Sequence, residues 1–368
     1  MISFGLSEEQ EIAREAMRDF AKDIIRPPAR DCDEESAVGD DFLQEMWQLG
    51  LTSTQIPEQF GGGGEDNSQL MNVIMLEELA HGDVGLALAA LSPSLFVNPI
   101  VEQGTDEQKA AYLPAFCGES FQAGSLALIE PGPIFDPYEL RTKATKQSDT
   151  YVLNGEKSFV PLADKANHFL VAAALDDDNG GGRGAFIVPR DAAGISISKV
   201  ERSLGLNAFA TYGVKLEGVE VPSSDRLGGD DGGDIDRLVN LSRTALAALM
   251  VGLSRAVFEY AVPYAKDRVA FGEPIAQKQA IAFMLSDMRV EIDSMRWLVW
   301  KAASELEKGL NVTRSAHHAR SYAAEQSMKI ADNGVQVLGG HGFIRDHPVE
   351  MWYRNARTLG VLEGTAAI

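Results

Sequence analysis

Cysteine is scarce in this chain, since only Cys32 and Cys117 occur among its 368 residues. So few cysteines argue against a disulfide framework and fit a reducing compartment. The N-terminus has the features of neither a signal peptide nor a transit peptide, and no apolar run reaches membrane-spanning length. We therefore expect a cytoplasmic protein that does not bind or cross a membrane.

Basic residues are also in short supply. Lys and Arg total 33 against 54 Asp and Glu, which gives a formal net charge of −21. Nucleic acids and anionic membranes both require a basic surface, so this balance argues against either as a partner. Any anionic ligand must instead be held by a few locally placed Arg, Lys or backbone N–H groups.

Motifs for metal binding and for hydrolysis are missing as well. His317 and His318 are adjacent on a predicted helix, so they point in different directions and do not form the i, i+4 pair of a helical metal site. The chain has no GxSxG nucleophile motif. We predict no metal and find no indication of a hydrolase triad.

The first 120 residues have the pattern of a helical domain. Residues 7–10 form a capping box, and the helix that follows stops before Pro27-Pro28. A short helix is expected at 42–49, and apolar residues between 70 and 79 recur at helical spacing. A further helix starts at 105–108.

Residues 121–228 change to short runs of Val, Ile, Phe and Thr that are interrupted by Gly, Pro and Asn. Asn154-Gly155 after Tyr151 is a strong hairpin signal. Further strands are expected, in chain order, at 168–174, 185–188, 195–199 and 214–221. This pattern predicts a small β domain, either a barrel or a sandwich.

From residue 229 to residue 368 the chain becomes helical again, after a glycine- and aspartate-rich segment at 228–233. Apolar residues form one helical face between 246 and 264 and another between 281 and 299, and a third helix is expected at about 314–338. Long amphipathic helices joined by short loops predict an antiparallel bundle.

The C-terminal stretch 336–365 combines a double glycine, aromatic and basic residues, and one carboxylate beside a glycine. A helix should end at Gly339-Gly340, and another should begin near Pro348. The turn after it presents Glu363. The residues alone leave open whether Glu363 is a functional group or a solvated turn carboxylate.

This stretch resembles the C-terminal signature of the acyl-CoA dehydrogenase family, in which the glutamate of a Glu-Gly-Thr turn is the catalytic base. Arg268, Phe271 and Gly272, followed by Gln279, resemble the family's RxxFG…Q signature. The segment IEPG at 129–132 and the strand GVKLEGVEVP match its middle portion. The resemblance covers nearly the whole chain and implies an α+β fold with an N-terminal helical domain, a middle β-barrel domain and a C-terminal four-helix bundle.

The resemblance also implies a chemistry. Oxidising a saturated acyl-CoA thioester needs a base for the α-proton and an acceptor for the β-hydride, and the family uses FAD as that acceptor. Glu363 would be the base, and a bound acyl chain would expel water and raise its basicity. Family partners are acyl-CoA, an electron-transferring flavoprotein and further subunits of a tetramer.

Further site residues follow from the same resemblance. Arg243 matches a position near the CoA pantetheine, Thr365 a cofactor-binding position, and Phe159 a residue that covers one flavin face. The residues that match the adenine and pyrophosphate side of an FAD site are Arg268, Phe271, Gln279, Gln336 and Gly340. In the family this second group lies across a subunit interface and serves the flavin of the neighbouring chain.

The isoalloxazine side departs from the family pattern. Ile129 and Phe135 stand at hydroxyl positions, and Pro161 has neither the hydroxyl nor the backbone N–H that could bond flavin N5. Ala367 replaces a polar residue, and the LGxRxS-like stretch is altered. Several hydrogen-bonding positions around one ring system have become apolar together.

Three interpretations therefore remain open. The chain is an FAD-dependent acyl-CoA dehydrogenase with a variant pocket in a homotetramer. Alternatively, it is a flavin-poor partner subunit of a heterotetramer that lends its adenine-side residues to a paralogous chain. In the third interpretation, the chain is a non-enzymatic helical interaction protein on the same scaffold. The flavin content of the purified protein and a Glu363→Gln variant separate the first two.

Overall fold

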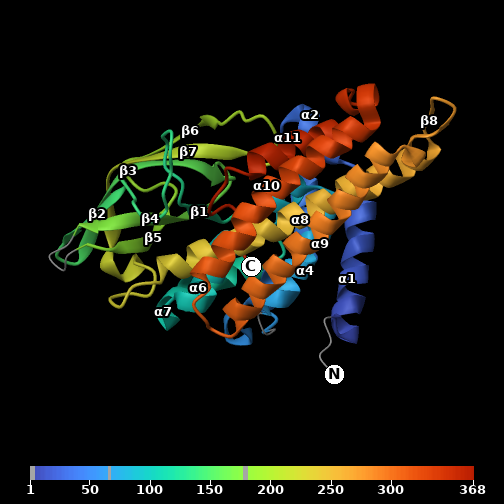
Figure 1. Cartoon of the computed structure of the whole chain (residues 1–368). Helices are drawn as coiled ribbons and strands as arrows, with labels where there is room; N and C mark the ends of the chain where they lie inside the picture. The colour runs from blue at the N-terminus through green and yellow to red at the C-terminus, as the bar shows by residue number, and fades with distance from the viewer. Residues whose placement is uncertain (1–4, 65–67, 177–180) are drawn as a thin grey trace.

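The computed structural model describes residues 5–64, 68–176 and 181–368. Helices from both ends of the chain pack together, and a sheet built from the middle of the chain lies against them (Figure 1). The predicted α+β fold is confirmed. The exact division of the chain at residues 120 and 228 stays a prediction.

The N-terminal part is helical, as expected. Its helices are α1 (Glu8–Phe20), α2 (Ala29–Glu35), α3 (Asp40–Trp47), α4 (Gln69–Gly82), α5 (Val84–Ala90), α6 (Ser94–Gln103) and α7 (Asp106–Tyr112). The predicted capping box is present, with Ser7 as the N-cap residue, and Thr105 forms a second one at the helix start expected at 105–108. A π-helical turn, Ala21–Ile25, extends α1.

Helix α2 was not predicted, because Pro27-Pro28 was interpreted only as a stop signal. In the structure Pro28 is the N-cap residue of α2 and has helical dihedral angles. Proline has no N–H to donate, but the first N–H groups of a helix have no intrahelical partner in any case. The same residues therefore end one helix and begin the next.

The middle of the chain forms one seven-stranded mixed sheet. Its strands are β1 (Ser125–Ala127), β2 (Lys143–Gln147), β3 (Thr150–Pro161), β4 (His168–Asp176), β5 (Arg183–Pro189), β6 (Ile195–Val200) and β7 (Thr211–Pro222). The order is β1-β4-β2-β3-β7-β6, and β5 pairs with β4. Strands β1 and β2 each run parallel to β4, whereas the other pairings in this sheet are antiparallel.

The predicted hairpin at Asn154-Gly155 is wrong. Strand β3 continues through both residues, with a register shift against β7 at this point. The reversal between β2 and β3 lies earlier, at Ser148, whose φ is 53°. A Cβ on Gly155 would lie 2.7 Å from the Thr142 Cα, and the side chain of Asn154 accepts a hydrogen bond from the Gly218 N–H. The Asn-Gly pair therefore forms a bulge where two backbones approach closely.

The C-terminal part is the predicted bundle. Its helices are α8 (Ile235–Asp267), α9 (Gln279–Glu307), α10 (Thr313–Leu338) and α11 (Val349–Leu359). A two-stranded hairpin, β8 (Val269–Ala270) and β9 (Glu273–Pro274), projects from the junction of α8 and α9 (Figure 1). Helix α4 of the N-terminal part also packs along α8, where a Cβ on Gly252 would lie 2.1 Å from the Glu77 carbonyl oxygen.

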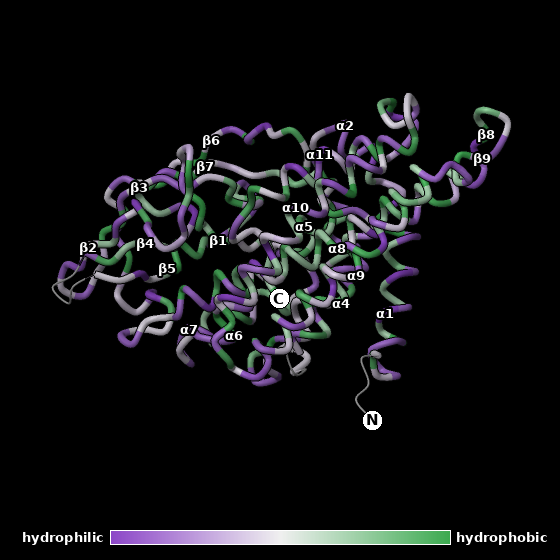
Figure 2. The backbone as a smooth tube through the Cα atoms, viewed as in Figure 1, coloured by the Kyte–Doolittle hydropathy of each residue, from purple (hydrophilic) through white to green (hydrophobic). Residues whose placement is uncertain are grey.

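Helix α8 is the apolar centre of this assembly. By length and composition alone its 33 residues suffice to cross a membrane, which the sequence interpretation did not anticipate. Most of its apolar window is buried against neighbouring elements, and hydrophobic residues gather along it and in the adjoining strands (Figure 2). A long, apolar and buried helix is what the centre of a helical bundle requires.

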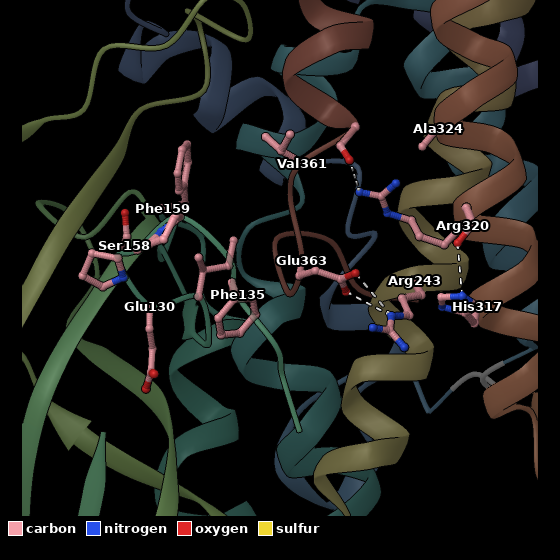
Figure 3. Close-up of a pocket in the computed structure, with 16 residues that line it drawn as sticks. Glu130, Phe135, Ser158, Phe159, Arg243, His317, Arg320, Ala324, Val361 and Glu363 are labelled. Atoms are coloured by element: carbon pink, nitrogen blue, oxygen red, sulfur yellow. Dashed lines mark hydrogen bonds and ion pairs between the residues drawn. The ribbon is translucent and has the colours of Figure 1, made fainter. Parts of the chain in front are cut away.

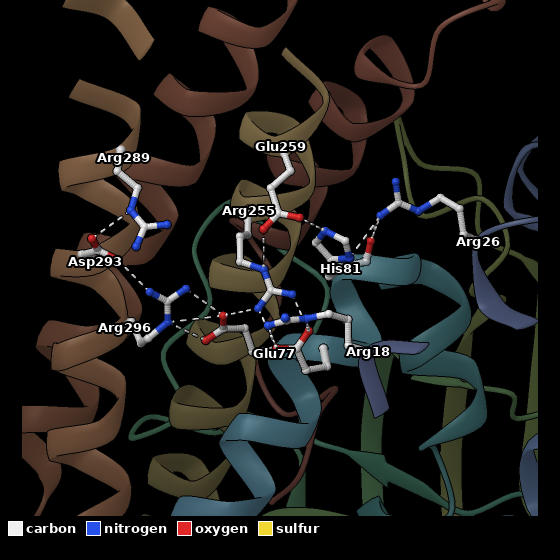
Figure 4. A network of polar contacts seen from close by, with 10 residues as sticks. Arg18, Arg26, Glu77, His81, Arg255, Glu259, Arg289, Asp293 and Arg296 are labelled. Atoms are coloured by element: carbon white, nitrogen blue, oxygen red, sulfur yellow. Dashed lines mark hydrogen bonds and ion pairs between the residues drawn. The ribbon is translucent and has the colours of Figure 1, made fainter. Parts of the chain in front are cut away.

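Buried charges join α4 to the bundle (Figure 4). The Arg255 guanidinium of α8 donates to Glu77 at 2.7 Å and to Glu78 at 2.8 Å. Arg296 of α9 donates to Glu77 at 2.8 Å. Arg255 and both glutamates are almost completely buried. Since a buried charge without a partner is very costly, this network requires α4, α8 and α9 to dock in one arrangement.

Substituting Gly155 tests the bulge. Gly155→Ala should lower the free energy of unfolding by about 2–4 kcal/mol, because the new methyl group meets the Thr142 backbone. Gly218→Ala is the control: Gly218 also has a positive φ, of 65°, but no atom of the described residues lies within 4 Å of its Cβ position. It should cost only about 1–2 kcal/mol. Equal losses for both variants in urea unfolding would contradict the close approach.

Candidate active site

A cleft of about 680 Å³ lies between the sheet and the helical bundle. One wall comes from the segment after β1 and from β3, and the other from α8, α10 and the turn after α11 (Figure 3). Its volume falls in the range of small-molecule and cofactor sites. Of the residues predicted from the sequence, Glu363, Arg243 and Phe159 all line it.

Glu363 is presented by a short turn after α11. Gly364, which follows it, has a φ of 66°, and a Cβ there would lie 2.7 Å from a methyl carbon of Leu128. Glycine is therefore required both by the backbone conformation and by the packing against the end of β1. Leu362 and Ala366 are buried on either side, so the flanking residues anchor the turn and Glu363 projects from it into the cleft.

Arg243 of α8 pairs with this carboxylate. Its Nε lies 3.3 Å from Glu363 Oε1 and 3.2 Å from Oε2. The two side chains are only 8% and 19% exposed, so the pair is largely shielded from solvent. Arg243 Nη1 also donates to the Tyr138 hydroxyl at 3.0 Å, and the guanidinium lies 5.5 Å from the centre of the Tyr138 ring. Tyr138 therefore helps to hold Arg243 against Glu363.

The sheet wall presents Phe159 in an unusual backbone conformation, with a φ of 53° at an irregularity in the pairing of β3 with β7. Its N–H donates to Glu201 Oε2 at 2.9 Å, and the Ser158 hydroxyl donates to Oε1 at 2.6 Å. The Thr211 hydroxyl also donates to Glu201, at 3.0 Å. A single carboxylate thus stabilises a strained residue and occupies three hydrogen-bond donors at this edge of the cleft.

A buried ion pair supports the same wall. Lys157 Nζ lies 2.9 Å from Glu130 Oε1 and 3.2 Å from the Leu128 carbonyl oxygen, and the lysine side chain is fully buried. Burial would raise the pKa of Glu130, but the charge of Lys157 and hydrogen bonds that include the Arg141 N–H lower it to about 2. Burial lowers the pKa of Lys157 to about 8, although Glu130 opposes this. Both groups are mainly ionised at neutral pH.

The remaining predicted residues do not line the cleft. Arg268, Phe271, Gln279, Gln336 and Gly340 are all exposed at the ends of α8, α9 and α10. The ends of α8 and α10 meet there, because the Tyr264 hydroxyl lies 2.8 Å from His341 Nδ1. Arg243 lies within α8, and Arg268 is the C-cap residue of the same helix. The two residues are 25 positions apart, which corresponds to about 37 Å along the helix axis.

Thr365 is buried, and its hydroxyl has no hydrogen-bond partner in the described part of the chain. The predicted cofactor contact of Thr365 stays a prediction. Ile129 and Phe135, the apolar replacements noted in the sequence, both line the cleft. Pro161 is buried, and its carbonyl oxygen accepts a hydrogen bond from the Ser125 hydroxyl.

Sequence reasoning missed three residues that shape the cleft: Tyr138, Glu201 and Arg320. None has a local signal. Tyr138 lies in the segment between β1 and β2, and Glu201 directly follows β6. Arg320 has the pattern of an ordinary helix residue, yet only 6% of it is exposed. Each acquires its role from a partner far away in the chain.

Comparisons with known proteins cover the whole chain. Family models described as the N-terminal, middle and C-terminal domains of acyl-CoA dehydrogenase match residues 7–120, 125–219 and 234–368. An acyl-CoA dehydrogenase of Bacillus subtilis is 35% identical over 99% of this chain and 96% of its own length. Subunit CarC of the caffeyl-CoA reductase-Etf complex of Acetobacterium woodii is 34% identical over 98% and 96%.

Solved structures agree with these matches. The structure of butyryl-CoA dehydrogenase from Megasphaera elsdenii superimposes with a TM-score of 0.88. It is 30% identical in sequence, and the match covers 100% of this chain and 96% of that protein.

The buried pair of the sheet wall can be tested by substitution. Lys157→Met should lower the free energy of unfolding by about 3–5 kcal/mol, because Glu130 is left buried without its cation. The double variant Glu130→Gln with Lys157→Met should recover part of this loss. As a control, Lys215→Met removes one partner of an exposed pair with Glu217 and should change stability by less than about 1 kcal/mol. Urea unfolding measures all three.

Proposed function

Because the chain belongs to the acyl-CoA dehydrogenase family of FAD-dependent oxidoreductases that act on CH–CH bonds, we propose that Glu363 removes the α-proton of an acyl-CoA thioester bound in the cleft. One observation carries this proposal. The Glu363 carboxylate lies in a cleft of cofactor size, opposite the sheet wall that bears Phe159. A base within reach of a bound substrate is the first requirement for proton abstraction.

The environment of Glu363 suits a base that must be ionised before the reaction. Arg243 stabilises the carboxylate through an ion pair. An acyl chain that enters the cleft displaces water from around the carboxylate and disfavours its charged form. Arg243 opposes this effect while it stays paired, so the basicity of Glu363 depends on how far substrate binding separates the pair. Arg243, which lines the same cleft, is also proposed to lie near the pantetheine part of the bound CoA.

FAD, when bound, supplies the acceptor for the hydride that leaves the β-carbon. The residues present fit its ring system mainly by packing: Phe159, Phe135 and Ile129 offer apolar surface within the cleft. The buried hydroxyl of Thr365, which has no hydrogen-bond partner among the described residues, is a further candidate contact. The sheet wall offers few hydrogen bonds to this ring system, because its donors Phe159, Ser158 and Thr211 already donate to Glu201.

The exposed group around Arg268 is proposed to bind the adenine and pyrophosphate of FAD held by a neighbouring chain. The separation of about 37 Å between Arg243 and Arg268 supports this arrangement, because it exceeds the length of one FAD molecule. A guanidinium suits the doubly charged pyrophosphate. The site is then complete only in an oligomer, and the family forms tetramers.

An electron-transferring flavoprotein is the proposed acceptor of the electrons. Support comes from the relative CarC, whose name places it in a complex with such a protein. The alternative function, a flavin-poor partner subunit in a heterotetramer, is favoured by the apolar residues Ile129 and Phe135 and by the donors that Glu201 occupies. In that case Glu363 is vestigial.

The role of Glu363 is tested by Glu363→Gln. This variant keeps the size of the side chain but removes the base, so the rate of anaerobic flavin reduction by an acyl-CoA should fall by about 100-fold to 10,000-fold. Glu325→Gln is the control, since Glu325 is an exposed glutamate of α10 paired with Lys329, and its rate should match that of the wild type. If Glu363→Gln kept the wild-type rate, Glu363 would be excluded as the base.

Flavin content separates the two candidate functions. We expect about one FAD per chain in the purified protein, with an absorbance that an acyl-CoA bleaches. A protein that stays colourless after addition of FAD, and gains flavin only together with a paralogous chain, would instead establish the partner-subunit function.

Mixing two inactive variants tests the shared site. Arg268→Ala should weaken binding of FAD in the neighbouring chain, whereas Glu363→Gln disables the base of its own chain. In mixed oligomers, an intact Arg268 from one chain can bind the FAD that lies beside the intact Glu363 of the other chain. Part of the activity should therefore return after the two variants are unfolded and refolded together. No recovery, with mixed oligomers shown by mass spectrometry, would place both groups in one chain's site.

A further inference from the structure

Arg320 of α10 is buried beside the turn that carries Glu363. Its Nη2 atom lies 3.1 Å from the Leu359 carbonyl oxygen, 3.1 Å from that of Gly360 and 2.7 Å from that of Leu362. Figure 3 shows its side chain reaching from α10 towards the end of α11. All three acceptors belong to the few residues that join α11 to Glu363.

These carbonyl groups need a donor from elsewhere. The last carbonyl groups of a helix have no intrahelical partner, and the C-terminus carries partial negative charge. Leu359 is the last residue of α11, and its carbonyl also accepts from the Leu362 N–H. The guanidinium therefore supplies both hydrogen bonds and a positive charge where the helix ends.

Arg320 forms no ion pair within the described ranges, although it is only 6% exposed. Burial lowers the pKa of its guanidinium, whereas the nearby charge of Glu363 raises it. A buried cation is costly unless something offsets it. Here the carbonyl dipoles and the field of Glu363 provide that offset, which links the charge of Arg320 to the carboxylate it supports.

We propose that Arg320 is a positioning residue for the base: it anchors the turn 359–362, so that Glu363 stays over the cleft, and its charge favours the carboxylate form that must exist before proton removal. This inference rests on the proposed role of Glu363. Gly364 fixes the turn from the other side, against Leu128. The turn is therefore held at both ends, by the bundle and by the sheet.

Several other groups face Glu363 and bear on the charge argument. Arg243 reaches it from α8, and Tyr138 contacts Arg243 from the segment between β1 and β2. His317 lines the same cleft from α10, and Glu130 lines it from the sheet side. Glu130 is neutralised by Lys157. Arg320 is thus the second guanidinium near the base, after Arg243.

Two substitutions and a control test the anchor. Arg320→Met removes the charge and the donors but keeps an unbranched side chain, and Arg320→Lys keeps the charge. Arg357→Met is the matched control, because Arg357 lies in the last turn of the same helix α11 but is exposed. Each protein is prepared as the FAD-loaded oligomer and compared with the wild type.

The first measurement needs no catalysis. Hydrogen–deuterium exchange should become faster in residues 360–366 of Arg320→Met, whereas Arg357→Met should match the wild type. Unchanged exchange in Arg320→Met would overturn the anchoring role. If the wild-type protein fails to react with acyl-CoA, the proposed function of Glu363 is refuted. The exchange measurement still decides whether Arg320 anchors the turn, because it does not depend on catalysis.

The second measurement is the pH dependence of flavin reduction. In Arg320→Met the maximal rate should fall by about 10-fold to 100-fold with little change in KM, as expected for a misplaced base. The acidic limb of its pH profile should move to higher pH, because a nearby positive charge is lost. Arg320→Lys should restore the acidic limb.

A purely structural role predicts a different result. If Arg320→Met lost activity only in proportion to its loss of folded, flavin-containing protein, with an unchanged pH profile, the electrostatic part of the proposal would be wrong. The same conclusion would follow if Arg320→Lys shifted the acidic limb as far as Arg320→Met does.

Discussion

The length and burial of α8 constrain everything else in this molecule. This one helix of 33 residues packs against α4, α9, α10 and α11, so its two ends cannot approach each other. Arg243, near its start, faces the cleft, and Arg268 lies at its far end. This separation supports the proposal that Arg268 serves a flavin held by a neighbouring chain.

The cleft divides its chemistry between two walls. The bundle side carries the charges, with Glu363 held by Arg243 and its turn held by Arg320. On the sheet side Phe159, Phe135 and Ile129 offer apolar surface to the cleft, and Glu130, which also lines it, is paired with the buried Lys157. Such a division suits a reaction in which a proton leaves towards one wall while a flat ring system lies against the other.

Buried ion pairs recur in this acidic protein, and their positions suggest a common purpose. The Arg255 network docks α4 on α8, and the Lys157–Glu130 pair fixes the sheet wall. Pairs of this kind add little net stability, because desolvation offsets most of their attraction. Losing one partner is costly, however, so they disfavour any other docking of the same elements. Each group of charges therefore fixes the packing on its own side of the cleft.

Local sequence determined a large part of this structure. The capping residues Ser7 and Thr105 mark their helices because their bonds span only three residues. The long helices of the bundle follow from apolar spacing, and the family signature pointed to Glu363, the carboxylate that lines the cleft.

Tertiary structure decided the rest. Asn154-Gly155 forms a bulge because Thr142 and Gly218 lie beside it, and Pro28 begins a helix that the proline pair alone did not reveal. Arg320 supports the turn before Glu363 only because α10 and α11 pack together. Each of these roles depends on a partner distant in sequence, and no local pattern records which distant groups the folded chain brings into contact.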